Sequence, residues 1–212
     1  TFLGVVDDFY NLNWKVKIIF QFMIVAIPVI FLNIFINIES IFGVNFNNYL
    51  NLLFTIFWII LLINSINFID NMDGFAGVNT SFICLALGVI SFLSNQNYLA
   101  DISFVLLFSI AGFFVLNFPP AKIYMGDSGS LFIGLFTYAI CVYMINQNLL
   151  DFWVFFILNS VFFIDSTITV LKRLLQRKNI FVAHNEHYYQ DYITEKNNTF
   201  KNYNNKFASR KK

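Results

Sequence analysis

Long runs of apolar residues separated by short polar segments dominate the sequence. A helix needs about 20 mainly apolar residues to cross a bilayer, within a range of about 17–25. Runs of this kind lie at residues 18–36, 50–66, 78–94, 102–118, 131–146 and 152–171. The pattern predicts an all-α fold, a multi-pass transmembrane helical bundle with about six full spans. Pro28 falls inside the first run, where a membrane helix tolerates it as a kink.

The composition agrees with a membrane protein. Hydrophobic residues make up 58% of the chain and charged residues 12%, whereas a soluble domain carries about a quarter charged residues. Cys84 and Cys141 both fall inside apolar runs, so we expect buried free thiols and no disulfide framework. We expect no nucleic-acid partner.

The first residues predict that the chain is a piece of a longer protein. It opens with Thr1 rather than Met, and TFLGVV is typical of the last turns of a helix. We expect residues 1–190 to form one transmembrane domain, whose N-terminal helices are missing. Residues 191–212 are expected to form a polar, basic cytoplasmic tail.

The basic residues are confined to alternate loops. Every Lys and Arg lies within residues 1–17, 67–77, 119–130 or 172–212. The charged residues of the intervening loops, at 37–49, 95–101 and 147–151, are the acids Glu39, Asp101 and Asp151. With alternating spans, all basic residues fall on one side, which the positive-inside rule makes cytoplasmic.

The same alternation brings three carboxylate clusters and both histidines to the predicted cytoplasmic face. Hard cations prefer carboxylate oxygens, so clusters that meet there would form a metal-and-phosphate site. The residues concerned are Asp7, Asp8, Asp70, Asp73, Asp127, His184 and His187.

Asp7 and Asp8 are adjacent carboxylates at a predicted helix end, about two turns before Lys15 and Lys17. Such a group can hold a divalent cation and pair with a phosphate. A solvated helix terminus, with lysines that only anchor the topology, explains the same pattern equally well.

Asn67, Asp70 and Asp73 recur at every third position of NSINFIDNMDGFAG, residues 64–77. We expect them to line one side of a helical turn, and the glycines that follow would let a ligand or another backbone approach. The alternative is a helix C-terminus followed by a glycine-capped polar turn. A polar stripe directly after an apolar run favours the functional interpretation.

Asp127 lies in a glycine-rich turn, AKIYMGDSGSLFIG, between two apolar runs. The Ser-Gly-Ser sequence after it predicts a helix start, whose free N–H groups and positive dipole end suit a phosphate. Asp127 is placed to hold Mg²⁺ against that phosphate. An Asp-Ser N-cap explains the turn as well, and capping is compatible with metal binding.

Two further features contain ionisable side chains. Asp165 lies inside the last apolar run, where an acid is a functional candidate by default. Pairing with a polar group on a neighbouring helix explains it equally well. His184 and His187 follow a basic stretch and are typical of a phosphate-binding element, although their spacing also permits a transition-metal site.

Four of these elements, in this order, resemble the polyprenyl-phosphate N-acetylhexosamine-1-phosphate transferase family, or glycosyltransferase family 4. The family includes the phospho-N-acetylmuramoyl-pentapeptide transferase of peptidoglycan synthesis and the GlcNAc-1-phosphate transferases that start O-antigen and teichoic-acid chains. The resemblance covers about residues 1–190. The matching elements are GVVDD, NFIDNMDG, PAKIYMGDSGSLFIG and AHNEHYYQ.

The resemblance implies a Mg²⁺-dependent enzyme of the bacterial inner membrane, with Mn²⁺ as the alternative cation. Undecaprenyl phosphate would attack the β-phosphate of a UDP-N-acetylamino sugar, UMP would leave, and the lipid-linked sugar would initiate a cell-envelope glycan. Single and double displacement both remain open, as does a homodimer. The phosphates repel each other, so such a site needs a cation and basic groups to neutralise charge while it positions the substrates.

Residue by residue, the resemblance makes Asp127 the expected Mg²⁺ ligand, with Asp8 as the second ligand. Asp7 is the candidate base that frees a phosphate oxygen of the lipid, so these three acids form the expected catalytic set. Tyr124 is expected to stack on uracil. The other residues expected to bind substrate are Lys15, Asn67, Asp70, Asp73, Asn117, His184 and His187.

The chain departs from the family pattern at both ends. It is expected to lack the first two helices of relatives and most of the third. Residues 191–212 are polar and basic, where relatives usually return to the membrane. The histidine element resembles the glycan-initiating branch more than the triple-His form of the peptidoglycan enzyme, which points to UDP-GlcNAc or a related deoxy-amino sugar.

Two other functions are alternatives to the transferase. An ion-coupled transporter would need acids in mid-span on several helices, whereas only Asp165 lies there. An inactive remnant acting as a membrane partner is the other alternative, and the intact acids Asp7, Asp8 and Asp127 argue against it. The transferase is therefore the function that the sequence favours.

Overall fold

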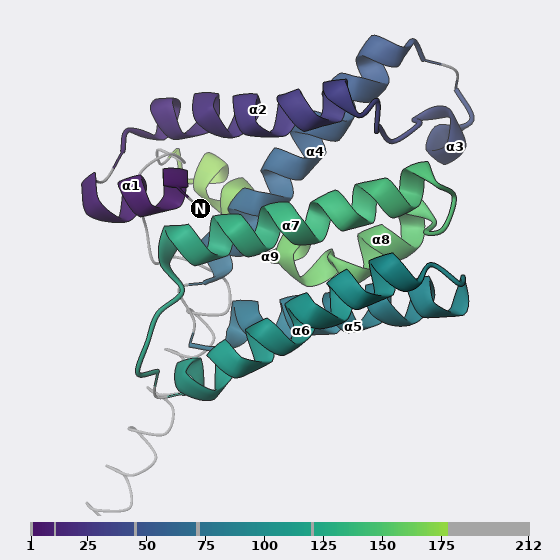
Figure 1. Ribbon diagram of the computed structural model, residues 1–212. Helices are drawn as coiled ribbons and strands as arrows, with labels where there is room; N and C mark the ends of the chain where they lie inside the picture. Colours follow the sequence, from purple (N-terminus) through teal and green to yellow (C-terminus); the bar gives the residue numbers. More distant parts are fainter. Residues whose placement is uncertain (1, 11, 45, 71–72, 120, 178–212) are drawn as a thin grey trace, which may run out of the picture. The chain divides into compact units, whose positions relative to one another are not determined.

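The structure, a computed structural model, describes residues 2–10, 12–44, 46–70, 73–119 and 121–177. Within these residues the secondary structure is helical and contains no strand, so the all-α prediction is confirmed. The helices, labelled as in Figure 1, are α1 (Phe2–Tyr10), α2 (Trp14–Phe31), α3 (Glu39–Phe42), α4 (Asn48–Ile69), α5 (Phe75–Leu93), α6 (Asn97–Asn117), α7 (Gly126–Asn146), α8 (Phe152–Leu158) and α9 (Ser160–Leu175).

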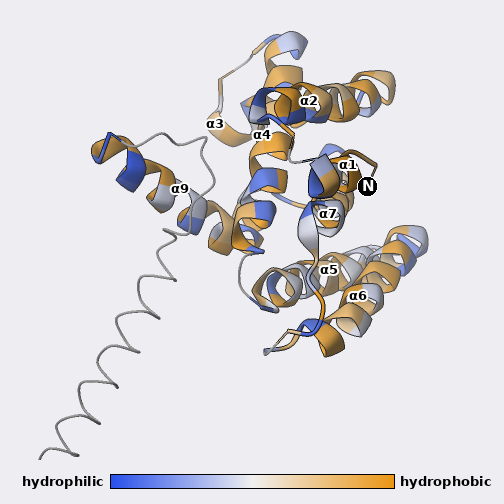
Figure 2. Cartoon of the chain, turned by 90° about the vertical axis from the view of Figure 1, so that its left-hand side faces the viewer, coloured by the Kyte–Doolittle hydropathy of each residue, from blue (hydrophilic) through white to orange (hydrophobic). Residues whose placement is uncertain are grey.

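Five of the described helices are long and apolar enough to cross a membrane, namely α2, α4, α5, α6 and α7. They are between 18 and 22 residues long, and Figure 2 shows that hydrophobic residues make up much of their length. A sixth candidate span is the pair α8 and α9, which is interrupted at Asn159. The protein is therefore a multi-pass helical membrane protein, and the prediction of about six spans is confirmed.

The predicted boundaries were wrong for the first and last runs. Helix α2 covers Trp14–Phe31 instead of 18–36, because Asn33 adopts a left-handed backbone conformation (φ 52°) that turns the chain out of the helix. The run at 152–171 is not one continuous helix. It is interrupted at Asn159, whose side chain donates to the carbonyl four residues earlier (2.8 Å).

The chain divides into two compact units, residues 1–163 and 164–212. In the first unit, α4 packs against both α2 and α7, while α5 and α6 run side by side (Figure 1). The core of this unit contains Ile56 and Ile66 of α4 together with Tyr138 and Met144 of α7. In the second unit the described residues continue α9. Cys84 and Cys141 are buried and free, as expected.

The α4–α5 turn is attached to the loop between α6 and α7. The Gly74 N–H donates to Asn117 Oδ1 (2.8 Å), and Asn117 Nδ2 donates to the Ile123 carbonyl (2.9 Å). Asp73 accepts a hydrogen bond from the Ala121 N–H (3.0 Å). These polar junctions therefore lie at one end of the bundle, as the alternation of spans predicts.

Helix α1 lies directly against the start of α7 because Gly4 has no side chain. A Cβ at Gly4 would lie 2.5 Å from the carbonyl oxygen of Asp127 and 2.6 Å from the backbone nitrogen of Ser128. Only glycine allows so close an approach of two helix backbones. The contact brings Asp7 and Asp8, one turn later on α1, next to the first turn of α7.

We expect Gly4→Ala to destabilise the protein by about 1–3 kcal/mol, because the added methyl group meets backbone rather than a flexible side chain. Gly112 of α6 is a matched control, since a Cβ there meets nothing within 4 Å. Gly112→Ala should leave stability unchanged or raise it. Thermal unfolding in detergent measures both. Equal melting temperatures for Gly4→Ala and the wild type would contradict the close α1–α7 contact.

Candidate active site

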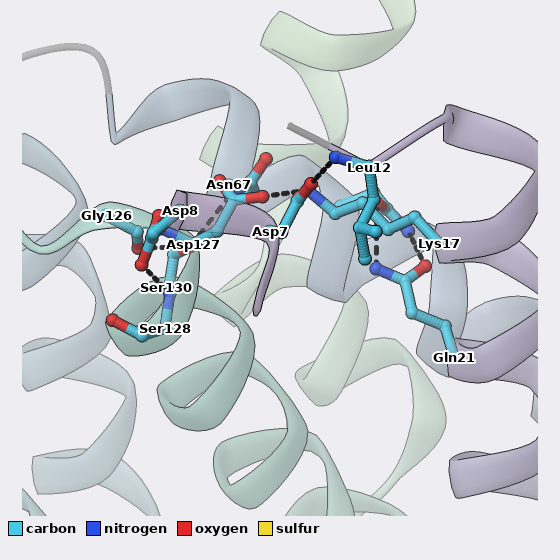
Figure 3. A network of polar contacts seen from close by, with 11 residues as sticks. Asp7, Asp8, Leu12, Lys17, Gln21, Asn67, Gly126, Asp127, Ser128 and Ser130 are labelled. Atoms are coloured by element: carbon cyan, nitrogen blue, oxygen red, sulfur yellow. Dashed lines mark hydrogen bonds and ion pairs between the residues drawn. The ribbon is translucent and has the colours of Figure 1, made fainter. Parts of the chain in front are cut away.

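Asp127, in the first turn of α7, is contacted by side chains from two other helices (Figure 3). Lys17 of α2 forms an ion pair with its Oδ2, and Asn67 of α4 donates to its Oδ1 (2.6 Å). Asn67 Nδ2 is also 2.8 Å from Ser130 Oγ, which donates to the Gly126 carbonyl (2.9 Å). One carboxylate therefore joins three helices.

Asp7 is the second carboxylate on the Lys17 ammonium, with Nζ 2.7 Å from its Oδ2. Its Oδ1 accepts the Leu12 N–H (2.7 Å), and the residue is only 8% exposed. Burial raises the pKa of Asp7, but the hydrogen bond and charge of Lys17 and the Leu12 amide oppose it, and this pKa lies below its usual value. Asp7 is therefore an ionised carboxylate at neutral pH.

Asp8 caps the N-terminus of α7. Its Oδ1 accepts the Asp127 N–H (2.8 Å) and its Oδ2 accepts the Ser128 N–H (3.0 Å), so the negative charge lies at the positive end of the helix dipole. Gly126 has a positive φ of 63°, which glycine tolerates. These two N–H groups belong to the helix start that was predicted to bind a phosphate, and here a carboxylate of the chain holds them.

Asp70 follows the last residue of α4 and faces the same helix start. It accepts a hydrogen bond from the Gly126 N–H. Burial raises the pKa of Asp70 to about 7, and the charges of Asp127 and Asp8 add to this shift. Four carboxylates, Asp7, Asp8, Asp70 and Asp127, lie around the single ammonium of Lys17, so the site contains more acidic than basic side chains.

The cluster formed by Asp7, Asp8, Asp70, Asp127 and Lys17 fits a hard divalent cation by its chemistry. It supplies carboxylate oxygens, which Mg²⁺ and Mn²⁺ prefer, and Lys17 already places one positive charge between two of them. Within the described residues, no three His, Cys, Asp or Glu side chains are arranged as ligands of one ion. A bound cation would therefore be held by few carboxylates.

Lys17 is the cluster residue that was not among the predicted site residues. The structure instead leaves the predicted Lys15 exposed, with its ammonium 5.6 Å from the Trp14 ring centroid. The spacing in the sequence was a signal for Lys17. Lys17, Gln21 and Val25 are four residues apart and therefore share one helix face, and Gln21 and Val25 on this face are buried.

The other predicted site residues make no contact that the structure shows with the carboxylate–lysine cluster, or they lie outside the described residues. Asp73 does not share a helix face with Asn67, because α4 ends at Ile69, so the predicted three-residue stripe was wrong. Asn117 is 3% exposed and holds backbone groups, whereas Tyr124 is 75% exposed. His184 and His187 lie outside the described residues.

Comparison with known families identifies the chain. The sequence profile described as "Glycosyl transferase family 4" matches residues 1–145, which include Asp7, Asp8, Asn67, Asp70 and Asp127. The chain belongs to this family. The resemblance found in the motifs is thereby confirmed, and the cluster is built from residues inside the matched region.

Curated proteins similar to this chain are longer than it. It is 29% identical over 193 residues to a "Probable undecaprenyl-phosphate N-acetylglucosaminyl 1-phosphate transferase" of Bacillus subtilis, covering 87% of the chain and 53% of that protein. It is 30% identical over 114 residues to a "Phospho-N-acetylmuramoyl-pentapeptide-transferase" of Streptococcus pneumoniae, covering 52% and 33%. The chain thus spans at most about half the length of these relatives.

We expect Asp70→Asn to stabilise the protein more at about pH 8 than at about pH 5. The pKa of Asp70 is raised from 3.8 to about 7, so between these values the unfolded chain loses a proton that the folded chain keeps. Native stability therefore falls as pH rises through this window. Asparagine removes the charge, and the gain at high pH should be on the order of 1–2 kcal/mol.

Thermal unfolding in detergent across this pH range measures the effect, and Asp101→Asn is the control. Asp101 is exposed on α6, so its replacement should change stability equally little at each pH. A difference between Asp70→Asn and the wild type that does not grow with pH would contradict the raised pKa.

Proposed function

We propose that the protein transfers an N-acetylamino-sugar 1-phosphate from a UDP-sugar to undecaprenyl phosphate and releases UMP. The observation that carries this proposal is the carboxylate–lysine cluster at the end of the bundle, where α1, α2, α4 and α7 meet at Asp127. Membership of the family and the names of the relatives support the same reaction class.

In the proposed reaction, a phosphate oxygen of the lipid forms a bond to the β-phosphorus of the UDP-sugar. The bond from that phosphorus to the oxygen bridging the two phosphates breaks, and the electron pair leaves with UMP. A site at the end of membrane-spanning helices suits this pairing, because the acceptor is a lipid and the donor is a soluble nucleotide. Catalysis of this kind consists mainly of positioning and charge stabilisation.

Asp127 and Asp8 are the residues that we propose would hold Mg²⁺, or Mn²⁺ in its place. Such a cation, when bound, would neutralise phosphate charge. Asp7, kept ionised at neutral pH by its contacts with Lys17 and the Leu12 N–H, is the proposed base for the lipid phosphate. We propose that the Lys17 ammonium, which pairs with Asp7 and Asp127, would also pair with a phosphate oxygen of a bound substrate.

The remaining predicted residues enter the proposal by their surroundings. Asn67 and Asp70 face the start of α7 and would contact the donor. Asp73 and Asn117 hold the loop that contains Tyr124, whose exposed ring is free to stack on a base. Lys15, which is exposed near the cluster, is also proposed to contact substrate. The same is proposed for His184 and His187, which lie outside the described residues.

We propose that the protein lies in the bacterial inner membrane with this cluster on the cytoplasmic side, because the predicted alternation of spans assigns the loops that contain Lys and Arg to that side. UDP-GlcNAc is the proposed donor, supported by the name of the Bacillus subtilis relative. The product would initiate a cell-envelope glycan. A homodimer remains a proposal, and no described contact bears on it.

The reaction is tested by measuring UMP release from purified protein in detergent, with undecaprenyl phosphate and a panel of UDP-amino sugars. We expect UMP only when the lipid and Mg²⁺ are both present, and none after EDTA. Release without the lipid would indicate hydrolysis, and no release from folded protein with any donor would contradict the proposed function.

Asp127→Asn should lower the rate of UMP release by about 100-fold or more, because removal of one preorganised charged group at a developing charge typically costs this much. Expression and melting temperature should stay close to those of the wild type. Asp101→Asn, at the opposite end of the bundle, is the matched control and should retain the wild-type rate. Wild-type rates for Asp127→Asn would remove this residue from the site.

A further inference from the structure

A pair of amide side chains lies inside the apolar contact between α2 and α4, just beyond the carboxylate cluster. Asn64 Nδ2 donates to Gln21 Oε1 (2.8 Å), and Gln21 Nε2 donates to Asn64 Oδ1 (3.3 Å). Asn64 Nδ2 also donates to the Ile60 carbonyl (2.8 Å). Gln21 is 4% exposed although it lies in a membrane-spanning helix. Buried amides in such helices are costly unless they are bonded to each other.

The pair lies one helical turn from the two side chains that hold Asp127. Lys17 precedes Gln21 by four residues on α2, and Asn67 follows Asn64 by three residues on α4. Residues at these spacings lie on the same helix face. Figure 3 shows Lys17 and Gln21 projecting from the same helix beside the cluster. Any rotation or sliding of α2 against α4 would therefore break the amide pair and displace Lys17 together.

Among the described residues, α2 is one of the least buried membrane-spanning helices. Only 22% of its membrane-spanning window is buried, against 44% for α4 and 50% for α7. Its buried face consists of Gln21, Val25, Ala26 and Val29. The apolar members of this face pack without strong directional preference, because hydrophobic contacts do not depend on orientation. The reciprocal amide bonds are directional, so they specify one rotation and one register.

We infer that Gln21 and Asn64 are positioning residues, which fix α2 against α4 so that the Lys17 ammonium lies between Asp7 and Asp127. The pair itself is placed away from the reacting atoms and acts through Lys17. Its effect on the position of Lys17 follows from the contacts alone, whereas its effect on catalysis rests on the proposed function. These two consequences can be measured separately.

The position of Lys17 is measured by pulse labelling with an amine-acylating reagent, followed by mass spectrometry of the peptides. Lys17 is half-buried and ion-paired, so it should react slowly, while the exposed Lys15 is an internal standard in the same peptide region. Asp127→Asn is the positive control, because it removes one ion pair and should make Lys17 more reactive. Lys15 should be unaffected.

The main variant is the double substitution Gln21→Met with Asn64→Leu. Replacing both partners by apolar side chains of similar size leaves no unpaired amide, so the fold should keep its melting temperature. We expect the ratio of Lys17 to Lys15 labelling to rise about fivefold, the effect of losing one typical hydrogen bond. An unchanged ratio in this double variant would overturn the inference.

The exchange of the two side chains, Gln21→Asn with Asn64→Gln, tests whether the bond itself matters. It keeps both amides and their combined length, so the labelling ratio should return to within about twofold of the wild type. A second control is Asn51→Leu, which removes a buried amide at the far end of α4. It should lower stability and leave Lys17 labelling unchanged. If Asn51→Leu raises the labelling as much as the double apolar variant, the effect is general loosening and the inference fails.

Catalysis supplies the separate readout. In a protein that releases UMP, the double apolar variant should lower kcat about fivefold and leave the KM for the UDP-sugar within about twofold, because Lys17 is displaced without loss of the donor contacts. If labelling changes as expected while no variant releases UMP, the positioning role stands and the proposed function fails. If UMP is released but kcat does not follow the labelling ratio, the position of Lys17 does not govern the reaction and the catalytic part of the inference is overturned.

Discussion

The ion pairs of Lys17 with Asp7 and Asp127 are the contact on which the rest of the site depends. One ammonium joins α1, α2 and α7, and Asn67 adds α4 through the same Asp127 carboxylate. Without that positive charge, the clustered acids would repel one another at a half-buried position. Four carboxylates and this one lysine make up the cluster, so it is short of positive charge.

That shortage connects the structure to the proposed chemistry. A cluster that is still electronegative attracts a divalent cation, and a cation with Lys17 beside it attracts phosphates. The start of α7 contributes to this negative charge. Asp8 and Asp70 accept hydrogen bonds from its first N–H groups, and their carboxyl groups therefore lie next to Asp127. The family assignment gives a reason why a membrane protein would maintain such a costly group of charges at one end of its helices.

The sequence was enough to predict the all-α membrane fold and the end of the bundle where the acids meet. The alternation of basic and acidic loops carried that prediction, because it reports which helix ends share a face. The apolar runs did not predict the helix ends at Asn33 and Asn159. Each of these is a local backbone effect that an apolar run does not reveal.

The contacts within the site were less predictable, because each one joins residues far apart in the chain. Lys15 and Lys17 occupy the same turn, and only the rotation of α2 against α4 decides which of them reaches Asp127. That rotation depends on Gln21 and Asn64, whose pairing joins separate helices. The sequence led us to expect that Asp8 holds a cation. It did not reveal the capping bonds of Asp8, because these depend on the Gly4 contact between α1 and α7.

The central claim is that the acids around Asp127 bind a divalent cation. Titration of Mg²⁺ against the melting temperature in detergent tests it most directly, since a ligand that binds only the folded state stabilises it. The account predicts that Mg²⁺ raises the melting temperature of the wild type and has little effect on Asp127→Asn. Equal stabilisation of both proteins would contradict a cation site at this carboxylate.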